Sequence, residues 1–212
     1  MVKIFVSENN ICWEKSVYEA VANRLPQALL EKAGKYRRWE DAQAFLMGRL
    51  LLGKGLAAQG VNGHEEIIQY NAYNRPYIAG ANVDFNISHS GGFVVCALGS
   101  NCRVGVDIER IHDVNVHDFA DCLTGEEWRR VNAQKESLPE FFRIWTIKEA
   151  VIKADGRGLQ IPLKEIQSDE QIYMADTLWS IYPLHIAQGY KAHLAIDKRV
   201  ETIEVHTISI FD

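Results

Sequence analysis

Two short segments of the chain bring together three carboxylates and two lysines. The segment Gly105-Val106-Asp107-Ile108-Glu109 alternates polar and apolar residues like a β-strand, so both acids are expected on one face. Two carboxylates about 4 Å apart repel by roughly 4 kcal/mol at an effective dielectric near 20, so they need a counter-charge. Mg²⁺ suits them, because it binds a few carboxylates and fills its other positions with water and phosphate. Gly105 is expected to leave room for that phosphate.

The second segment is predicted to be a buried helix around Glu149. Apolar residues surround it on nearly every side, and Glu149 is the one carboxylate between Phe141 and Ala154. Lys153 follows Glu149 by about one helical turn, and Lys148 precedes it directly. An exposed Glu-Lys pair of little energetic weight is the alternative. In apolar surroundings, however, an acid and a lysine need partners, which a metal and a phosphate would supply.

Together these segments resemble the paired signature of the surfactin-synthetase type of 4'-phosphopantetheinyl transferase. In that family a Gly-x-Asp-x-Glu strand precedes a Trp-x-x-Lys-Glu-Ala-x-x-Lys helix. An isolated Asp-x-Glu is a weak signal, whereas ordered matches over most of the chain are a strong one. The further matches are Tyr36 to Gly48 with Glu40-Asp41-Ala42, Asn74-Arg75-Pro76, Phe85-Asn86-Ile87-Ser88-His89-Ser90, Leu123-Thr124-Gly125-Glu126 and Gly156-Arg157-Gly158-Leu159.

The resemblance implies an enzyme that transfers the 4'-phosphopantetheine arm of coenzyme A to a serine of an apo acyl- or peptidyl-carrier protein, releasing adenosine 3',5'-bisphosphate. Asp107, Glu109 and Glu149 would then hold Mg²⁺ against the pyrophosphate. Glu149 would also be the base for the carrier serine, directly or through water. Lys153 and Lys148 would neutralise the pyrophosphate and assist the leaving oxygen. Phosphoryl transfer depends on this combination of positioning and charge neutralisation.

The resemblance assigns the rest of coenzyme A to the first half of the chain. Ser88 and His89 match the family segment at the 3'-phosphate and adenosine end. A surface histidine is the alternative, but the neighbouring hydroxyls and glycines suit a phosphate. Arg75 keeps a cation before proline that can hold phosphate. Ala44 stands where the family often has arginine, and the candidates to replace that arginine are Lys32, Arg38 and Arg49.

Composition fits a compact protein outside the membrane. The chain has 212 residues, 47% of them hydrophobic, and no apolar run long enough for a membrane span or a signal peptide, so the cytoplasm is the expected location. The net charge of −5 argues against general nucleic-acid binding. The 4 cysteines form no close pair, which favours reduced thiols over disulfides or zinc. We expect a monomer.

A faint internal repeat predicts the fold. Trp39 and Ala44-Phe45-Leu46 reappear as Trp145 and Ala150-Val151-Ile152, each within a long helix. The expected fold class is α+β, a pseudo-dimer of two similar α/β halves, 1–100 and 101–212, with mostly antiparallel sheets. The resemblance places the cofactor in the cleft between the halves. The strands expected are 2–6, 83–87 and 93–98 in the first half, and 103–109, 190–196 and 201–210 in the second.

Two other classes of function stay open at this point. A different Mg²⁺-dependent phosphotransferase would share Asp107, Glu109 and Glu149 but use another donor. A non-catalytic module that binds coenzyme A or a carrier protein would not need Glu149 and Lys153, so their presence favours catalysis. The sequence does not distinguish fatty-acid, polyketide, nonribosomal-peptide and lysine-pathway carriers.

Overall fold

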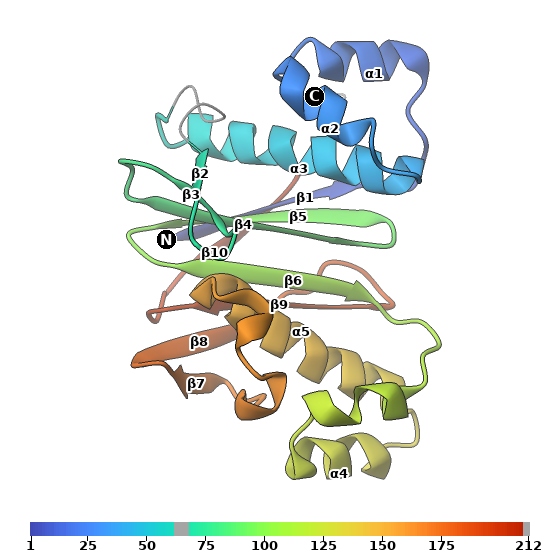
Figure 1. Cartoon of the computed structure of the whole chain (residues 1–212), viewed down its shortest axis with the longest axis vertical. Coiled ribbons are helices and arrows are strands. Elements are labelled where there is room, and N and C mark those ends of the chain that lie inside the picture. The colour runs from blue at the N-terminus through green and yellow to red at the C-terminus, as the bar shows by residue number, and fades with distance from the viewer. Residues whose placement is uncertain (62–67, 210–212) are drawn as a thin grey trace.

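The computed structural model of the chain describes residues 1–61 and 68–209. These residues form two four-stranded sheets and a two-stranded one, and Figure 1 shows a long helix beside each large sheet. The first sheet has the order β10-β1-β5-β4 and the second β6-β9-β8-β7. The first contains β1 (Val2–Glu8), β4 (Val83–Ser90), β5 (Phe93–Ser100) and β10 (Ile203–Thr207), and the second β6 (Val104–Arg110), β7 (Gln171–Met174), β8 (Thr177–Pro183) and β9 (Tyr190–Ile196).

Helices and a small hairpin fill the connections. No helix among the described residues is both long and apolar enough to cross a bilayer. Helix α5 ends at Gly156, whose φ of 88° is a left-handed conformation that glycine adopts without strain. The elements are α1 (Lys15–Ala22), α2 (Gln27–Ala33), α3 (Trp39–Ala57), β2 (Ile68–Tyr70), β3 (Pro76–Ile78), α4 (Gly125–Ala133), α5 (Ser137–Asp155) and the 3-10 helices Val116–Cys122, Gly158–Gln160 and Leu163–Glu165.

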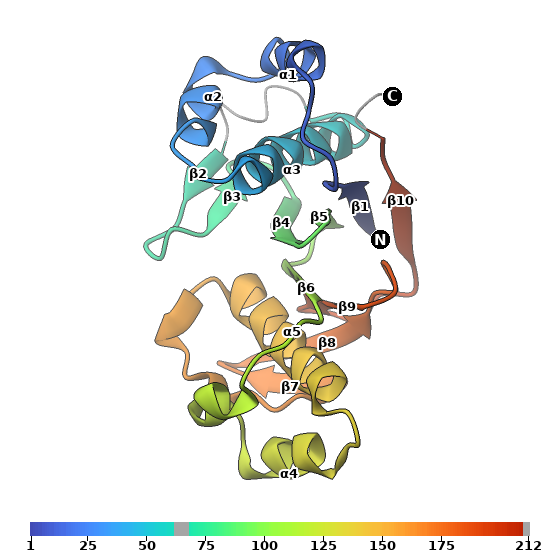
Figure 2. The ribbon, with the colours of Figure 1, turned by 90° about the vertical axis from the view of Figure 1, so that its right-hand side faces the viewer.

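The two large sheets stack between α3 and α5. Ile4 of β1 belongs to the same buried cluster as Val106 of β6 and Leu194 of β9, so the sheets pack on each other through these side chains. Its neighbour Phe5 points the other way, into the cluster that α3 covers. Trp179 of β8 lies in the cluster that α5 covers. Figure 2 accordingly shows α3 against one sheet and α5 against the other.

The order of the strands confirms the expected repeat. In the first sheet the opening strand β1 neighbours β5, which neighbours β4, and in the second the opening strand β6 neighbours β9, which neighbours β8. All of these pairs are antiparallel. The fold class is therefore α+β with mostly antiparallel sheets in two similar halves, as the sequence predicts.

The last strand differs from the expectation. Residues 190–196 and 201–210 were expected to close the second half together, but β10 pairs in parallel with β1, from Val2 with Ile203 to Val6 with Thr207. Residue 210 lies outside the described residues. Strand β9 has no free edge for β10, because β6 and β8 already flank it. The division of the chain between residues 100 and 101 stays a prediction. Strand β10 belongs to the second half by sequence but pairs with β1 of the first half.

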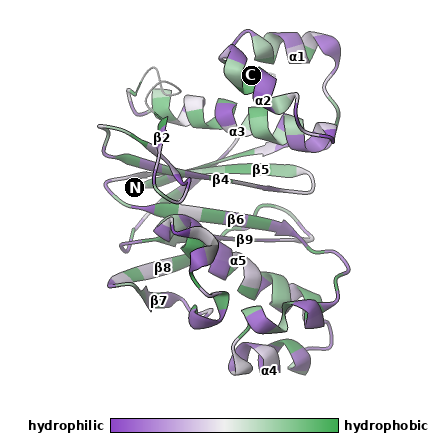
Figure 3. Cartoon of the chain, viewed as in Figure 1, coloured by the Kyte–Doolittle hydropathy of each residue, from purple (hydrophilic) through white to green (hydrophobic). Residues whose placement is uncertain are grey.

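Strand β6 carries charged residues in its interior, unlike strand β5 of the first sheet, which is apolar. Figure 3 shows the hydrophobic colour along much of β5, which is buried on both faces. Strand β6 is apolar on the face towards the first sheet. Its other face carries Gly105, Asp107 and Glu109, next to α5. These acids interrupt an otherwise apolar interior, which marks the candidate site.

Candidate active site

Gly105 allows α5 to cross very close to β6. A Cβ atom at this position would lie 2.1 Å from the carbonyl oxygen of Ala150 and 2.4 Å from the nitrogen of Ala154. No side chain fits in that space. The expectation that Gly105 makes room for a phosphate is therefore wrong, because the backbone of the helix fills the space. The close crossing instead brings the helix residues Glu149 and Lys153 near the acids of the strand.

Asp107 is the most buried acid of this site. Its side chain is 4% exposed, and its Oδ1 lies 2.6 Å from the Lys153 Nζ. The same oxygen accepts a hydrogen bond from Ser88 Oγ at 2.9 Å. Its Oδ2 is buried without a hydrogen-bond partner among the described residues. Because such an atom is costly to leave alone, Asp107 has one oxygen available for a cation.

Ser88 supports Asp107 and Lys153. Its hydroxyl donates to Asp107, and it accepts hydrogen bonds from the Ile108 N–H at 3.4 Å and the Lys153 Nζ at 3.0 Å. One hydroxyl offers one donor and two acceptor positions, so these contacts occupy all of them. The direct contact with coenzyme A that the sequence suggests for Ser88 does not fit this arrangement.

Glu109 and Glu149 extend the negative charge around Asp107. Burial raises the pKa of Glu149, and the charges of Asp107 and Glu109 raise it further, while Lys153 opposes the rise. Burial also raises the pKa of Glu109, against the hydrogen bond from Ser90, and Asp107 adds to the rise. The structure therefore brings the three carboxylates and Lys153 into one electrostatic site.

These oxygen donors fit a hard divalent cation such as Mg²⁺. In the part of the chain that the structure describes, no three His, Cys, Asp or Glu side chains are grouped closely enough to hold a metal alone. The donor types are nevertheless those that Mg²⁺ prefers, because it takes carboxylate oxygens and fills its remaining positions with water and substrate phosphate. The buried Oδ2 of Asp107 lacks a hydrogen-bond partner among the described residues. Burial raises the pKa of both glutamates and the Asp107 charge adds to the rise, so a cation here would stabilise their ionised forms.

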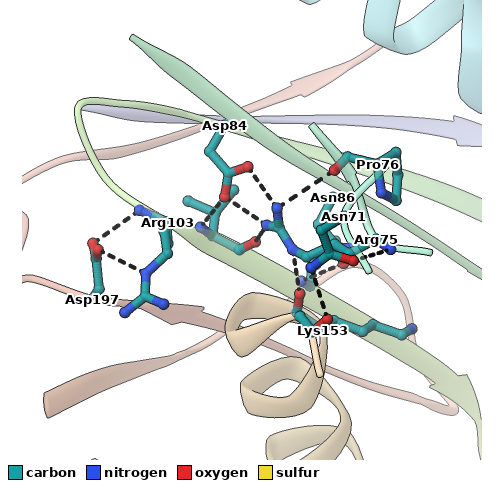
Figure 4. A network of polar contacts seen from close by, with 11 residues as sticks. Asn71, Arg75, Pro76, Asp84, Asn86, Arg103, Lys153 and Asp197 are labelled. Carbon is teal, nitrogen blue, oxygen red and sulfur yellow. Dashed lines mark hydrogen bonds and ion pairs between the residues drawn. The ribbon is translucent and has the colours of Figure 1, made fainter. Parts of the chain in front are cut away.

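Arg75 joins the two halves instead of offering its guanidinium to a phosphate (Figure 4). Two of its N–H groups donate to the Asp84 carboxylate at 2.9 and 2.6 Å. The others donate to the carbonyl oxygens of Lys153 at 2.7 Å, Val104 at 3.0 Å and Pro76 at 3.5 Å. Because a guanidinium has five N–H donors, all are occupied. We therefore correct the assignment of Arg75 from phosphate contact to structural link.

Lys148 is also placed differently from the expectation. Its side chain is fully buried, and its Nζ lies 2.7 Å from Glu127 Oε2. It also donates to the carbonyl oxygens of Leu163 at 2.9 Å and Ile166 at 2.6 Å. An ammonium has three donors, so none remains for the pyrophosphate. Lys148 fastens α4 and the segment 163–166 to α5, and the assignment to the cofactor is corrected.

Glu127, the partner of Lys148, is a residue that sequence reasoning missed. It closes a capping box at the start of α4, where the Thr124 N–H donates to Glu127 Oε2 at 2.8 Å and the Glu127 N–H to Thr124 Oγ1 at 3.2 Å. Burial alone would raise the pKa of Glu127, but the Lys148 ammonium and the Thr124 N–H outweigh it and lower that pKa. The Thr-x-x-Glu spacing signals the start of a helix, but not a buried lysine.

His89 lies beside the site at the exposed surface of β4. Partial burial lowers the pKa of His89, and Lys153 adds to this effect, against the charges of Asp41 and Asp107. The imidazole is therefore within electrostatic reach of the Asp107 and Lys153 pair. Its contact with the 3'-phosphate stays a prediction.

The basic residues of the first half lie on and beside α3. Lys32 is exposed, with its Nζ 5.1 Å from the centre of the Phe45 ring, and the Arg49 guanidinium lies 5.6 Å from the same centre. Arg38 is exposed and pairs with Glu40 at 3.2 Å. Ala44 is buried in the core under α3. Binding of coenzyme A by Lys32 or Arg38 stays a prediction.

Comparison with known proteins covers both halves of the chain. The family model of the 4'-phosphopantetheinyl transferase superfamily matches residues 103–196, and that of the 4'-phosphopantetheinyl transferase N-terminal region matches residues 12–101. The first match contains the three carboxylates and Lys153. The two matches meet between β5 and β6.

Three relatives are similar over different lengths. The 4'-phosphopantetheinyl transferase gsp of Aneurinibacillus migulanus is 33% identical over 84% of this chain and 78% of its own. The 4'-phosphopantetheinyl transferase Sfp of Bacillus subtilis is 31% identical over 63% of this chain and 61% of its own. The human L-aminoadipate-semialdehyde dehydrogenase-phosphopantetheinyl transferase is 31% identical over 66% of this chain and 50% of its own. The chain therefore belongs to the 4'-phosphopantetheinyl transferase family.

Proposed function

We propose that this transferase moves the 4'-phosphopantetheine arm of coenzyme A to a serine of an apo carrier protein, releases adenosine 3',5'-bisphosphate and depends on Mg²⁺. The observation that carries the proposal is the Lys153–Asp107 ion pair where α5 crosses β6, together with the electrostatic coupling of Asp107 to Glu109 and Glu149. Membership of the family supports this donor over that of another phosphotransferase.

The residues of the site divide the chemistry among them. Mg²⁺ bound by Asp107, Glu109 and Glu149 would supply electrophilic stabilisation of the pyrophosphate. Glu149 accepts the proton of the serine hydroxyl, and its raised pKa brings it closer to the neutral range in which a base works best. The serine oxygen bonds to the phosphorus of the arm as the bond to the bridging oxygen breaks. Lys153, held beside Asp107, stabilises the charge on that leaving oxygen.

The far end of coenzyme A is assigned to the first half. His89, on the exposed surface of β4, is nearest the 3'-phosphate. Lys32 and Arg38 act from the surface by attracting the polyanionic cofactor. Removal of His89 should weaken coenzyme A about tenfold or more relative to dephospho-coenzyme A, because charge-assisted contacts contribute about 1.5 to 3 kcal/mol.

The partner is an apo acyl- or peptidyl-carrier protein, bound by a monomer in the cytoplasm. With a net charge of −5, the chain needs a local basic surface to steer an acidic carrier. Nucleic acid and membrane have no part in this proposal.

Mass spectrometry of carrier proteins tests the proposal. The protein is incubated with coenzyme A, MgCl₂ and a panel of apo carriers, and each carrier is then weighed intact. We expect one carrier or more to gain a single phosphopantetheine group, and the gain to disappear with EDTA or with a carrier whose serine is replaced by alanine. If no carrier gains mass although coenzyme A binds, a non-catalytic module is favoured.

A further inference from the structure

The edges of the two large sheets meet along β4 and β6, where side chains replace a backbone ladder. The side chain of every second residue of β4 accepts a hydrogen bond from the backbone N–H of every second residue of β6. We call this row of acceptors the β4 seam. It satisfies N–H groups on the edge of β6 that pairs with no strand among residues 1–61 and 68–209. The seam consists of Asp84 with Val104 N–H at 2.8 Å, Asn86 with Val106 N–H at 3.0 Å, Ser88 with Ile108 N–H at 3.4 Å and Ser90 with Arg110 N–H at 3.1 Å.

The residue types along the β4 seam match the side chains of the adjacent β6 residues. The first two seam residues, an acid and an amide, flank Gly105, which has no side chain to oppose them. The last two are serines, and they contact Asp107 and Glu109. A carboxylate at a serine position would place like charges together, and an alanine would offer no donor. The β4 seam therefore has serines at the positions where β6 carries the acids of the site, and an acid and an amide where it does not.

Each serine hydroxyl has one proton, and the seam fixes its direction. Ser90 accepts the N–H of Arg110 on a lone pair, so its proton is available for Glu109 Oε2, which it contacts at 2.6 Å. A bond this short is typical of a hydroxyl that donates to an ionised carboxylate. The backbone of β6 thus orients Ser90, and Ser90 in turn orients Glu109.

We propose that Ser90 is a positioning residue that holds the Glu109 carboxylate beside Asp107 and Glu149 for metal binding. Ser90 belongs to the first half and Glu109 to the second, so the docking of the halves shapes the site. This inference rests on the proposed function of the same carboxylates. Partners behind a metal ligand usually set its orientation and change metal affinity about 10- to 100-fold when removed.

Ser90 isolates this role better than Ser88 does. The Ser88 hydroxyl also contacts Lys153, so replacing it disturbs two groups of the proposed chemistry. Asn86 is the matched control, because it accepts a β6 N–H at a similar distance and contributes to the same seam. Its neighbour on β6 is Gly105, so its loss weakens the seam without releasing a carboxylate.

The test measures metal affinity apart from turnover. Mn²⁺, a paramagnetic probe of Mg²⁺ sites, is titrated into the full chain, and free Mn²⁺ is followed by electron paramagnetic resonance. The variants are Ser90→Ala, Ser90→Thr, which keeps the hydroxyl, and Asn86→Ala, each checked by thermal unfolding. We expect Ser90→Ala to weaken Mn²⁺ about 10- to 100-fold, and Ser90→Thr and Asn86→Ala to stay within a few-fold of wild type.

The outcomes separate this inference from the proposed function. If wild type binds Mn²⁺ and Ser90→Ala binds it equally well, the positioning role is overturned while the proposed function stands. An equal loss in Ser90→Ala and Asn86→Ala also overturns it, because the effect would then belong to the seam as a whole. If wild type binds no Mn²⁺, the metal assignment itself fails, and this inference fails with it.

Discussion

Helices α3 and α5 hold the same place in the two halves, but α3 closes a core and α5 carries the site. When the halves are aligned by their tryptophans, Gln43 falls on Glu149 and Met47 on Lys153. Met47 lies in the apolar cluster between α3 and the first sheet. Lys153 faces Asp107 at 2.6 Å instead. The same helix-on-sheet arrangement therefore serves packing in one half and chemistry in the other.

The polar residues at the shared position show what separates the two uses. The Gln43 amide is buried, and its nitrogen and its oxygen both have partners: it donates to Asn9 Oδ1 at 2.7 Å and Ile11 O at 2.8 Å and accepts the Trp13 N–H at 2.9 Å. Burial raises the pKa of Glu149, and the charges of Asp107 and Glu109 raise it further. A buried polar group whose hydrogen bonds are made stabilises the fold. A carboxylate whose ionised form is disfavoured by its surroundings is instead available for chemistry.

A reciprocal exchange at this position tests the contrast and has the largest expected effect. Glu149→Gln keeps the shape but cannot accept a proton at neutral pH, so turnover should fall about 10²- to 10⁴-fold in a folded protein. Gln43→Glu should instead lower the free energy of unfolding, because a carboxylate cannot donate to Asn9 and Ile11. Single-turnover transfer and urea unfolding of both variants measure this. Equal turnover in Glu149→Gln and wild type would remove the base role.

Calorimetry on Glu149→Gln then distinguishes base from metal ligand. If Glu149 is mainly the base, Mg²⁺ and coenzyme A bind within a few-fold of wild type. If it is mainly a ligand, Mg²⁺ affinity falls in step with turnover, and added Mg²⁺ restores much of the rate.

Two lysines within α5 repeat the contrast on a smaller scale. Lys148→Met should cost about 3 to 5 kcal/mol of stability, because it leaves Glu127 buried without its partner. Lys153→Met should cost less, since its side chain is 28% exposed, but should lose most of the transfer activity. Added Mg²⁺ should restabilise only the second variant, by replacing the cation beside Asp107. Thermal unfolding with and without Mg²⁺ checks this, and equal stability losses would contradict it.

Strands β1 and β6, which lie beneath α3 and α5, predict different dependences of protein stability on pH. Phe5 of β1 pairs with Cys96, whereas Asp107 of β6 pairs with His193, whose Nδ1 lies 2.7 Å from Thr146 Oγ1. Burial, with help from nearby basic groups, lowers the pKa of His193 to about 4.

Between pH 6.5 and 4 the unfolded chain therefore binds a proton at His193 that the folded chain does not. Stability should fall as pH falls through this window, by up to about 3 kcal/mol from this residue. His193→Gln should flatten the profile there. Unfolding measured every half unit of pH tests the prediction, and parallel profiles for the two proteins would refute it.

Substitutions in the two-residue hairpin turns of the two halves have the smallest expected effect on stability. The β4–β5 turn uses Gly91, with a φ of 53°, whereas the β7–β8 turn holds Ala175 at 48° and Asp176 at 59°. Non-glycine residues are strained there, and Asn-Gly is preferred. Replacing Ala175 with Asn and Asp176 with Gly should stabilise the protein by about 1 kcal/mol. Gly91→Ala, the control, should destabilise it, because its Cβ would lie 2.5 Å from Tyr190 Oη. An unchanged melting temperature in the double variant would count against turn strain.

Alternation along the strands predicted much of the fold and the centre of the site. It placed Asp107 and Glu109 on one face, and their contacts with Ser88 and Ser90 of the same neighbouring strand agree. Helical geometry also separates the two lysines, which lie about 140° apart around the helix, whereas Glu149 and Lys153 lie about 40° apart. Applied strictly, that geometry would have excluded Lys148 from the site.

Other features depend on contacts that are distant in sequence. Nothing in residues 203–207 tells which sheet edge is free, so the pairing of β10 with β1 was missed. The space beside Gly105 depends on where α5 crosses, and the saturation of Arg75 depends on carbonyls of both halves. A motif identifies the residue type, but only the packing decides whether its polar groups remain available.

The most direct test of the central claim is the rate of arm transfer to a carrier against Mg²⁺ concentration, for wild type and Asp107→Ala. Asp107 contacts Lys153, its charge adds to the raised pKa of both glutamates, and its buried Oδ2 has no hydrogen-bond partner among the described residues. We predict a saturable Mg²⁺ dependence in wild type and the loss of most of the rate at every Mg²⁺ concentration in Asp107→Ala. The variant should stay folded, with equal or higher stability without metal, because one of three like charges is gone. A curve for Asp107→Ala that overlays that of wild type would contradict the account.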